Sequence, residues 1–180
     1  KLPRSTTTTG PTEVTEGRFF TDGENMAAFG AWSTPPYPPA LRERLRLALG
    51  QQEAPAGLVR ELTEAHAAVV AGLLADARLT PADVGVIGFH GHTLAHRPDQ
   101  RFTLQIGDGQ LLAHLTGIDV VADFRSQDVA AGGQGAPLAP LYHRALANSL
   151  ATPTPNAADA VLNIGGVANV TYLGSDCVLA

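Results

Sequence analysis

Three short polar stretches carry residue types that could do chemistry, and each follows an apolar run. The first is HGHT at residues 90–93, the second is DFRSQD at residues 123–128, and the third is NIGG at residues 163–166. Open α/β sheets bind ligands in the crevice at the carboxyl ends of their strands. We therefore expect the three stretches to belong to one kind of site.

The histidines of the first stretch allow two interpretations. A His-X-His pair on a strand would place the imidazoles of His90 and His92 on one face, with His96 close behind, so zinc or another divalent ion is conceivable. The sequence offers no neighbouring cysteine and no His-Glu-X-X-His helix. Each histidine could instead hydrogen-bond a ligand or a backbone carbonyl. No metal ligand is assigned, and a metal-dependent hydrolase built on His90 and His92 stays an alternative.

The second stretch combines two carboxylates with an arginine. Asp123 or Asp128 could act as a general base, and Arg125 could clamp a carboxylate or phosphate. The glycines that follow, at positions 132, 133 and 135, would let backbone N–H groups approach a ligand. The alternative is an ion pair at the strand end, followed by a turn that needs positive φ.

The third stretch contains two adjacent glycines between two apolar runs. Gly165 and Gly166 could form a hairpin around a phosphate or simply a tight hairpin turn. The two interpretations stay open on the residues alone.

The apolar periodicity around these stretches predicts an α/β fold. Leu41, Leu45 and Leu49 mark a short helix ending at Gly50, and a second helix is expected from about Leu58 to Arg78. Strands follow over residues 83–91, 102–108 and 118–124, with a short helix over 109–117, a helix over 138–150 and strands over 159–166 and 167–174. Strands that are apolar on both faces are typical of a sheet covered by helices.

The domain organisation follows from two polar segments. Residues 1–25 show little periodicity and are expected to form a tail or an exposed hairpin. The segment ATPTPNAA at residues 151–158 contains two prolines and is the best boundary candidate. We therefore expect a first domain over residues 1–150 and the first strands of a second domain over residues 159–180.

Composition excludes several classes of partner. The chain of 180 residues has a formal net charge of −5, which argues against binding to nucleic acid or an anionic membrane. Cys177 is the single cysteine, so an internal disulfide framework is excluded. We find no run of 18 uncharged apolar residues and no signal peptide, and we expect a cytoplasmic protein without a membrane partner.

The combination of motifs is more specific than its parts. GFHGHT, TLQIGDGQLLAHLTGIDVVADFRSQDVAAGGQGAPLAPLYH and LNIGGVANVTYL, in this order, closely resemble the anhydro-N-acetylmuramic acid kinase family. The resemblance covers roughly residues 31–174 and is strongest from residue 87. It implies an actin-like, ribonuclease-H-like ATPase fold of the sugar kinase type, with a mixed sheet flanked by helices and a second domain that is truncated here.

The resemblance also implies an activity and a set of site residues. Such kinases open the 1,6-anhydro bridge of anhydro-N-acetylmuramic acid and phosphorylate O6 from ATP and Mg²⁺, giving N-acetylmuramic acid 6-phosphate for cell-wall recycling. Asp128 matches the catalytic base. His90, Thr93 and Arg125 match positions on the sugar side, and the phosphate hairpin matches Gly165, Gly166 and Asn169. A homodimer is left open.

Two departures from the family pattern stand out. His92 occupies a position where the family usually carries Gln, and no Gly-Thr-Ser-X-Asp-Gly phosphate loop occurs near the start of the chain. Family members are also about twice as long. We therefore expect this chain alone to be inactive, and a non-catalytic sugar-binding or nucleotide-binding relic is a further alternative.

Overall fold

The computed structural model describes residues 4–9, 14–22, 25–150, 159–164, 168–173 and 178–179. By its internal contacts the chain divides into two units. The first comprises Lys1–Phe20 and Ala28–Gly135, and the second comprises Thr21–Ala27 and Ala136–Ala180. Both units combine helices with strands, so the α/β class predicted from the periodicity is confirmed.

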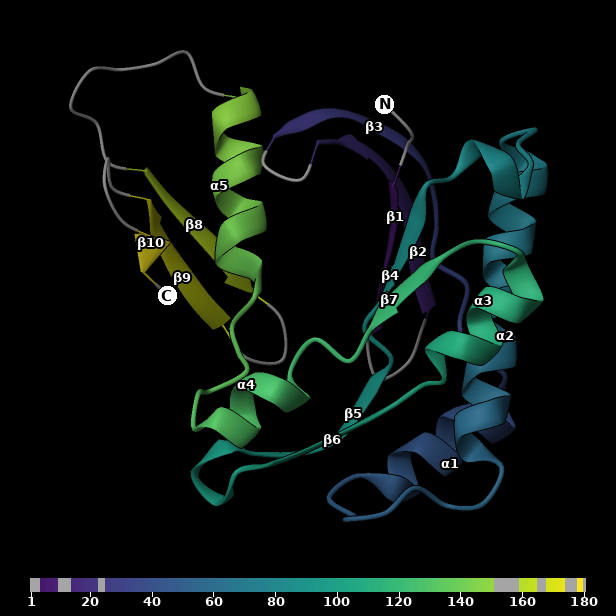
Figure 1. Cartoon of the computed structure of the whole chain (residues 1–180), viewed down its shortest axis with the longest axis vertical. Helices are drawn as coiled ribbons and strands as arrows, with labels where there is room; N and C mark the ends of the chain where they lie inside the picture. Colours follow the sequence, from purple (N-terminus) through teal and green to yellow (C-terminus); the bar gives the residue numbers. More distant parts are fainter. Residues whose placement is uncertain are drawn as a thin grey trace. The chain divides into compact units, whose positions relative to one another are not determined.

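The main sheet has five strands in the order β3-β2-β1-β4-β7. Their bounds are β1 Arg4–Thr9, β2 Val14–Thr21, β3 Met26–Ser33, β4 Val86–Phe89 and β7 Val120–Ala122. β1 runs antiparallel to β2 and parallel to β4, and β4 runs parallel to β7 (Figure 1). The sheet is therefore mixed, as expected, and the carboxyl ends of β4 and β7 lie at the same edge.

The start of the chain differs from the expectation of a tail or an exposed hairpin. β1 and β2 do form an antiparallel pair, but the pair is part of the sheet, because β1 also hydrogen-bonds with β4. Val14 and Glu16 on β2 are buried. The threonine-rich run reads as polar, yet threonine is β-branched and suits a pleated strand. The polar composition of β1 therefore gave no strand pattern in the sequence, and its pairing with β2 and β4 defines it as a strand.

The helices of the first unit are α1 Pro39–Ala48, α2 Leu58–Asp76, α3 Gly109–Thr116 and the short α4 Ser126–Ala131. α2 and α3 lie together on one side of the sheet (Figure 1). The predicted leucine stripe is confirmed in part: Leu41 and Leu45 pack in one cluster with Leu58 and Leu62 of α2, but Leu49 follows the end of α1 and is 51% exposed. The predicted helix over 109–117 is also confirmed: Asp108 accepts the Leu111 N–H at its start, and Gly117 ends it.

Two further strands form a separate ribbon. β5 His92–Arg97 pairs antiparallel with β6 Phe102–Ile106, with an irregularity between Thr93 and Ala95. The connection contains the 3₁₀ turn η2 Pro98–Gln100, and a similar turn, η1 Pro81–Asp83, precedes β4. The sequence pattern predicted β6 but not β5. Thr93 lies directly opposite Gln105 in this ribbon, a pairing that becomes important below.

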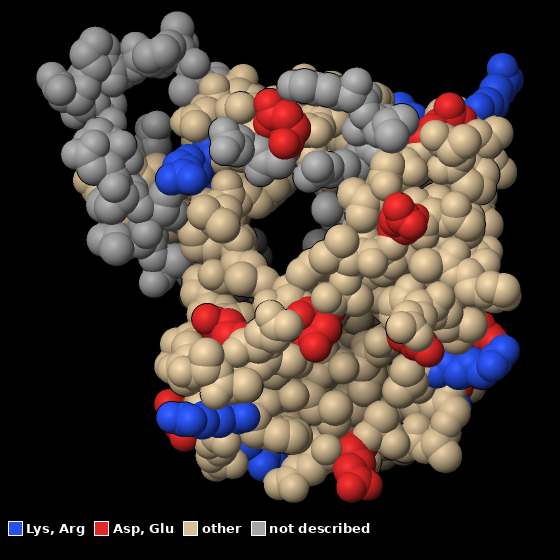
Figure 2. Space-filling view, in the orientation of Figure 1, with Lys and Arg blue, Asp and Glu red and all other residues tan. Residues whose placement is uncertain are grey.

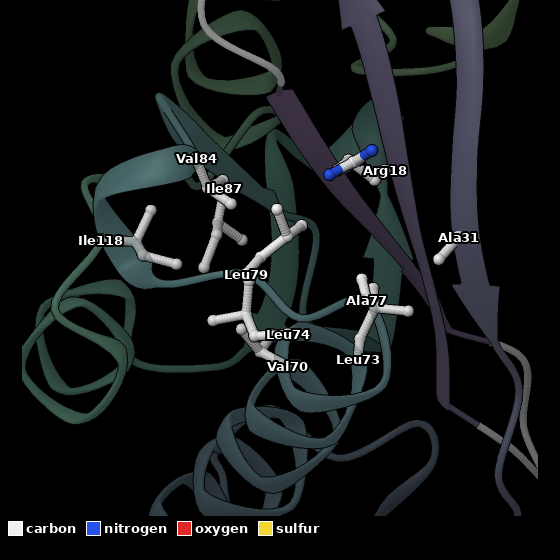
Figure 3. Close-up of a pocket in the computed structure, with 10 residues that line it drawn as sticks. All are labelled: Arg18, Ala31, Val70, Leu73, Leu74, Ala77, Leu79, Val84, Ile87 and Ile118. Atoms are coloured by element: carbon white, nitrogen blue, oxygen red, sulfur yellow. The ribbon is translucent and has the colours of Figure 1, made fainter.

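The core between α2 and the sheet is closely packed. Val70 and Leu73 of α2 face Val84 and Ile87, and Figure 3 shows these apolar side chains converging around a small space. That space holds about 10 Å³, close to the room one water needs, so it is a packing gap and no ligand site. Arg18 is the charged residue among those that line it.

The second unit places α5 Ala139–Leu150 against a three-stranded antiparallel sheet. Its strands are β8 Asp159–Ile164, β9 Ala168–Leu173 and β10 Val178–Leu179, in the order β10-β9-β8. The buried His143 Nδ1 lies 2.8 Å from Thr171 Oγ1 and ties α5 to β9. The helix expected over residues 138–150 thus groups with the following strands, although the sequence assigned it to the first domain.

Surface features add little that singles out a partner. Figure 2 shows acidic and basic side chains interspersed over one face of the described residues, without a concentrated basic patch on that face. No helix in the described part of the chain has the length and apolar content that crossing a bilayer requires.

Candidate functional site

A cleft of about 480 Å³ lies at the sheet edge where β4 and β7 end. Residues 89–91 at the end of β4 and residues 105–110 from the end of β6 into α3 line it. Val120 and Ala122 of β7, Asp123 directly after β7, and Val59 of α2 complete the lining. The carboxyl ends of parallel strands are the expected place for a ligand in such a sheet. The stretch HGHT and the start of DFRSQD therefore meet as predicted.

Two glycines allow the end of β4 to pass close to the end of β6. Gly91 has φ of +68°, and a Cβ there would overlap the carbonyl oxygen of Ile106. Gly107 has φ of +145°, and a Cβ there would lie 2.7 Å from the Phe89 ring. A side chain at either position would push the two segments apart, so both glycines shape the wall of the cleft.

His90 is the centre of a hydrogen-bond network on this wall. Its Nε2 lies 2.8 Å from Arg125 Nη2 and 3.1 Å from Gln105 Nε2, and its Nδ1 lies 3.1 Å from the Gly91 carbonyl oxygen. A guanidinium can only donate, so Nε2 must be the acceptor. Nδ1 consequently carries the proton and donates it to Gly91. His90 is therefore a neutral imidazole with a defined tautomer.

The pKa values of the site agree with that tautomer. Burial lowers the pKa of His90, the Gly91 carbonyl opposes this effect, and the positive charge of Arg125 lowers the pKa further. Burial, followed by the proximity of His90, also lowers the pKa of His92. Burial lowers the pKa of Arg125 as well. Burial and the charge of Arg125 thus favour the neutral form of His90, against which the guanidinium of Arg125 is held.

Gln105 joins Thr93, the third residue predicted to lie on the sugar side, to this network. Its Nε2 lies 3.4 Å from Thr93 Oγ1, across the β5–β6 ribbon. Gln105 Oε1 and Arg125 Nε are buried without a hydrogen-bond partner. Each unpaired buried polar atom costs about 1–3 kcal/mol, and such atoms at a cleft call for an explanation.

Asp128 is positioned by the glycine-rich loop that follows α4. Its Oδ2 accepts the Gly135 N–H at 2.6 Å, and a Cβ on Gly133 would overlap the carboxylate. Arg125 donates to the carbonyl oxygen of the same Gly135 at 3.2 Å. Among the described residues Arg125 forms no ion pair with either Asp123 or Asp128, so the ion-pair alternative is not what the structure shows. The positive φ expected of the turn is present at Gly132 and Gly135.

The two other carboxylates of the site line the cleft itself. Asp123 follows β7 in the left-handed region, with φ of +56°, and its Oδ1 accepts a hydrogen bond from Ser126 Oγ. Asp108 caps α3, and its backbone N–H donates to Thr63 Oγ1 at 3.0 Å. Asp128 is not among the residues lining this cleft. Asp108 and Asp123 therefore line the cleft, whereas Asp128 does not.

The metal alternative finds no support in the part of the chain that the structure describes. His90 and His92 do not share a strand, since His90 follows β4, Gly91 turns the chain, and His92 begins β5. Within the described ranges no three His, Cys, Asp or Glu residues are grouped to hold a metal ion. The nitrogen that His90 could offer a metal already accepts from Arg125.

The predicted phosphate hairpin is described only in its strands. Asn169 lies on β9 opposite Asn163, and Ile164 pairs with Ala168. Gly165 and Gly166 lie outside the described residues.

Of the predicted sugar-side residues, the structure brings His90, Thr93 and Arg125 together through Gln105. The sequence analysis did not single out Gln105. Gln105 fits the alternation of apolar and polar residues in FTLQI, so the strand pattern gave no signal that distinguishes it.

Fold and cleft together define an α/β protein with a cleft at the carboxyl ends of parallel strands, lined by His90 and Asp123, with Arg125 hydrogen-bonded to His90. The family described as anhydro-N-acetylmuramic acid kinase matches residues 19–178. This protein belongs to the anhydro-N-acetylmuramic acid kinase family.

Similar proteins carry the same family description. The anhydro-N-acetylmuramic acid kinase of Paramagnetospirillum magneticum is 53% identical over 156 residues, which cover 87% of this chain and 42% of the relative. The kinase of Bradyrhizobium diazoefficiens is 46% identical over 171 residues, 89% of this chain and 46% of the relative. That of Azorhizobium caulinodans is 51% identical over 163 residues, 85% of this chain and 43% of the relative. The chain thus spans less than half the length of these relatives.

Proposed function

We propose that the full-length protein carrying this sequence is an ATP-dependent kinase for anhydro-N-acetylmuramic acid. It opens the 1,6-anhydro bridge with water and phosphorylates O6, giving N-acetylmuramic acid 6-phosphate for cell-wall recycling. The fold that goes with this activity is an actin-like ATPase of the sugar kinase type, in which a second domain completes the nucleotide site. The family match over residues 19–178 supports the proposal.

The observation that carries the proposal furthest is the convergence of the three sugar-side residues. His90 and Arg125 are separated by 35 positions in the sequence, yet their side chains hydrogen-bond at 2.8 Å, and Thr93 joins them through Gln105. A hydroxyl beside a held guanidinium suits a sugar that carries hydroxyl groups and a carboxylate. The sugar is therefore assigned to the His90 side of the cleft.

Asp128 is assigned the role of general base. One carboxylate oxygen, Oδ2, is held by the Gly135 N–H, which leaves Oδ1 as a second acceptor for a proton. In the proposed reaction this carboxylate takes a proton from the water that attacks the anomeric carbon. The C1–O6 bond breaks as O6 bonds to the transferred phosphorus. Arg125 and Asp128 share Gly135 as a neighbour, so sugar binding and proton transfer would use one rigid frame.

The nucleotide is assigned to the connection between β8 and β9. Ile164 of β8 pairs with Ala168 of β9, and Gly165 and Gly166, which follow β8 in the sequence, would offer backbone donors without side chains. With Asn169 these residues would hold the phosphates of ATP, which supplies the phosphoryl group. Mg²⁺ would accompany those phosphates, and no described residue is assigned to it.

A direct assay tests the proposal. The full-length protein, incubated with the anhydro sugar, ATP and Mg²⁺, is expected to release ADP and the sugar 6-phosphate in equal amounts. The 180-residue chain alone is expected to give no measurable product, because phosphoryl transfer depends on positioning groups that the remaining half of the relatives' length supplies. A full-length protein that binds the sugar without consuming ATP would instead support the binding relic.

A further inference from the structure

Gln105 occupies a position that neither the motif residues nor the proposed mechanism explain. It lies on β6, lines the cleft, and contacts two of the three sugar-side residues. Its amide orientation follows from its neighbours. Because Arg125 makes His90 Nε2 an acceptor, Gln105 must present its NH₂ group to that nitrogen, since its carbonyl oxygen would face a lone pair.

That orientation leaves the amide oxygen in an unfavourable place. Gln105 Oε1 is buried and has no hydrogen-bond partner. Rotating the amide by half a turn would let Oε1 accept from the Thr93 hydroxyl but would set it against the His90 lone pair. In the observed orientation Gln105 therefore donates to His90, and its own amide oxygen is left without a hydrogen bond. Each buried polar atom left unpaired in this way calls for an explanation. Glu16 Oε2, Arg18 Nε and Thr34 Oγ1 are also unpaired among the described residues, but Gln105 is the one of these residues that lines the cleft.

The network continues from Gln105 toward the assigned base. Gln105 and Arg125 both meet His90, Arg125 donates to the Gly135 carbonyl, and the Gly135 N–H donates to Asp128. The orientation of the His90 ring is thus linked through one guanidinium and one peptide unit to the Asp128 carboxylate. A residue that fixes the orientation of the His90 ring therefore fixes the first group in the series of contacts that leads to Asp128.

We propose that Gln105 is a positioning residue for the sugar reaction: with Arg125, its amide holds His90 as the neutral tautomer that carries its proton on Nδ1, and it orients Thr93 beside it. The inference rests on the proposed function, because it concerns the same sugar side of the cleft. Gln105 does not touch the reacting atoms. It acts through His90, Thr93 and Arg125.

The first test replaces the amide with a carboxylate of the same shape. In full-length Gln105→Glu, the carboxylate faces His90 Nε2 and favours a proton there, so the pKa of His90 rises by about one unit or more. The charged and titratable groups near this ring are Arg125 directly before α4, His92 at the start of β5, and Asp108 and Asp123, which line the same cleft. They are unchanged in the variant. Gln100→Glu, at an exposed position in the same ribbon, is the matched control.

Two readouts are taken on these proteins. An NMR titration of the His90 imidazole is expected to shift upward in Gln105→Glu and to stay unchanged in Gln100→Glu. The acidic limb of kcat/KM for the sugar is expected to move upward by the same amount. An unshifted His90 titration would overturn the contact on which the inference depends. A shifted titration with an unmoved acidic limb would overturn the positioning role.

A second variant separates positioning from simple stability. Gln105→Met keeps the length of the side chain but removes both the donor and the unpaired oxygen, so its melting temperature is expected to equal or exceed the wild-type value. kcat/KM for the sugar is expected to fall about tenfold to a hundredfold, with the KM for ATP unchanged. A lower melting temperature with full activity in the folded protein would make Gln105 a structural residue only. If no variant or wild type shows kinase activity, the proposed function fails, while the titration still reports the His90 contact.

Discussion

Replacing Asp128 with asparagine in the full-length protein separates catalysis from structure at the assigned base. Asn keeps the size of the side chain but cannot accept a proton as a carboxylate does. Loss of a general base typically lowers turnover by about 10²- to 10⁴-fold. We expect Asp128→Asn to fall in that range while sugar binding persists.

The cost in stability can be derived from the contacts of Asp128. Its Oδ2 accepts a hydrogen bond from the Gly135 N–H at 2.6 Å, and the oxygen of an asparagine amide can still accept it. A charge-assisted bond becomes a neutral one, which costs about 0.5–1.5 kcal/mol. For a protein of the relatives' size this corresponds to a few degrees in melting temperature. The folded fraction at assay temperature should be nearly unchanged.

The assay measures turnover, sugar affinity and melting temperature on the same preparations. Asp123→Asn is the matched control, since Asp123 lies on the same loop, lines the cleft, and contacts Ser126 through its carboxylate. We expect a much smaller loss of turnover in the control. Near-wild-type turnover of Asp128→Asn, or a collapse confined to Asp123→Asn, would show that the wrong carboxylate has been assigned.

Three further substitutions test the packing, the buried charge and the phosphate hairpin. Gly91→Ala should lower the free energy of unfolding by about 1–3 kcal/mol because of its positive φ and the Ile106 carbonyl, whereas Gly72→Ala, which has open space in α2, should raise it by about 0.5–1 kcal/mol; denaturant titrations that show equal effects would contradict the crowding at Gly91. Burial raises the pKa of Glu16 to about 9. Its contribution to stability is therefore complete below the pKa of the unfolded state and is lost as the pH rises through the folded-state pKa. The 180-residue chain should therefore lose stability between pH 7 and pH 9 and Glu16→Gln should not, and parallel denaturation curves at the two pH values would refute a buried neutral carboxyl. Full-length Gly166→Val should raise the KM for ATP far more than that for the sugar, and an unchanged KM for ATP with an intact fold would reduce the glycine pair to a turn.

The buried cluster of Glu16, His66 and Tyr37 shows how much the tertiary structure can change the pKa of a residue. His66 of α2 lies between Glu16 and Tyr37, with 3.1 Å to each, and none of the three side chains is more than 2% exposed. Burial, followed by the proximity of His92, lowers the pKa of His66 to about 4. From the sequence, His66 is a helical histidine with no distinguishing pattern. Nothing local indicates a partner 50 residues earlier in the chain.

Local patterns sufficed where a structure depends on near neighbours. The spacing of apolar residues predicted α1 and α2, and the pattern over residues 109–117 predicted α3, because a helix satisfies its hydrogen bonds within itself. The motif resemblance likewise selected the family and three residues that do converge. Strands β1, β2, β3 and β5 were missed, since a strand is defined by partners that are distant in sequence and a polar threonine run gives no periodicity.

The sequence by itself therefore determined the α/β class, the family, and the identity of the polar residues at the strand ends. Only the tertiary structure decided which of these residues meet. Gln105 stands opposite Thr93 because of the register of one ribbon, and His90 meets Arg125 because β4 and β7 are parallel neighbours that end at one edge. Register and strand order are set by packing between distant segments, and the tautomer of His90 follows from those contacts.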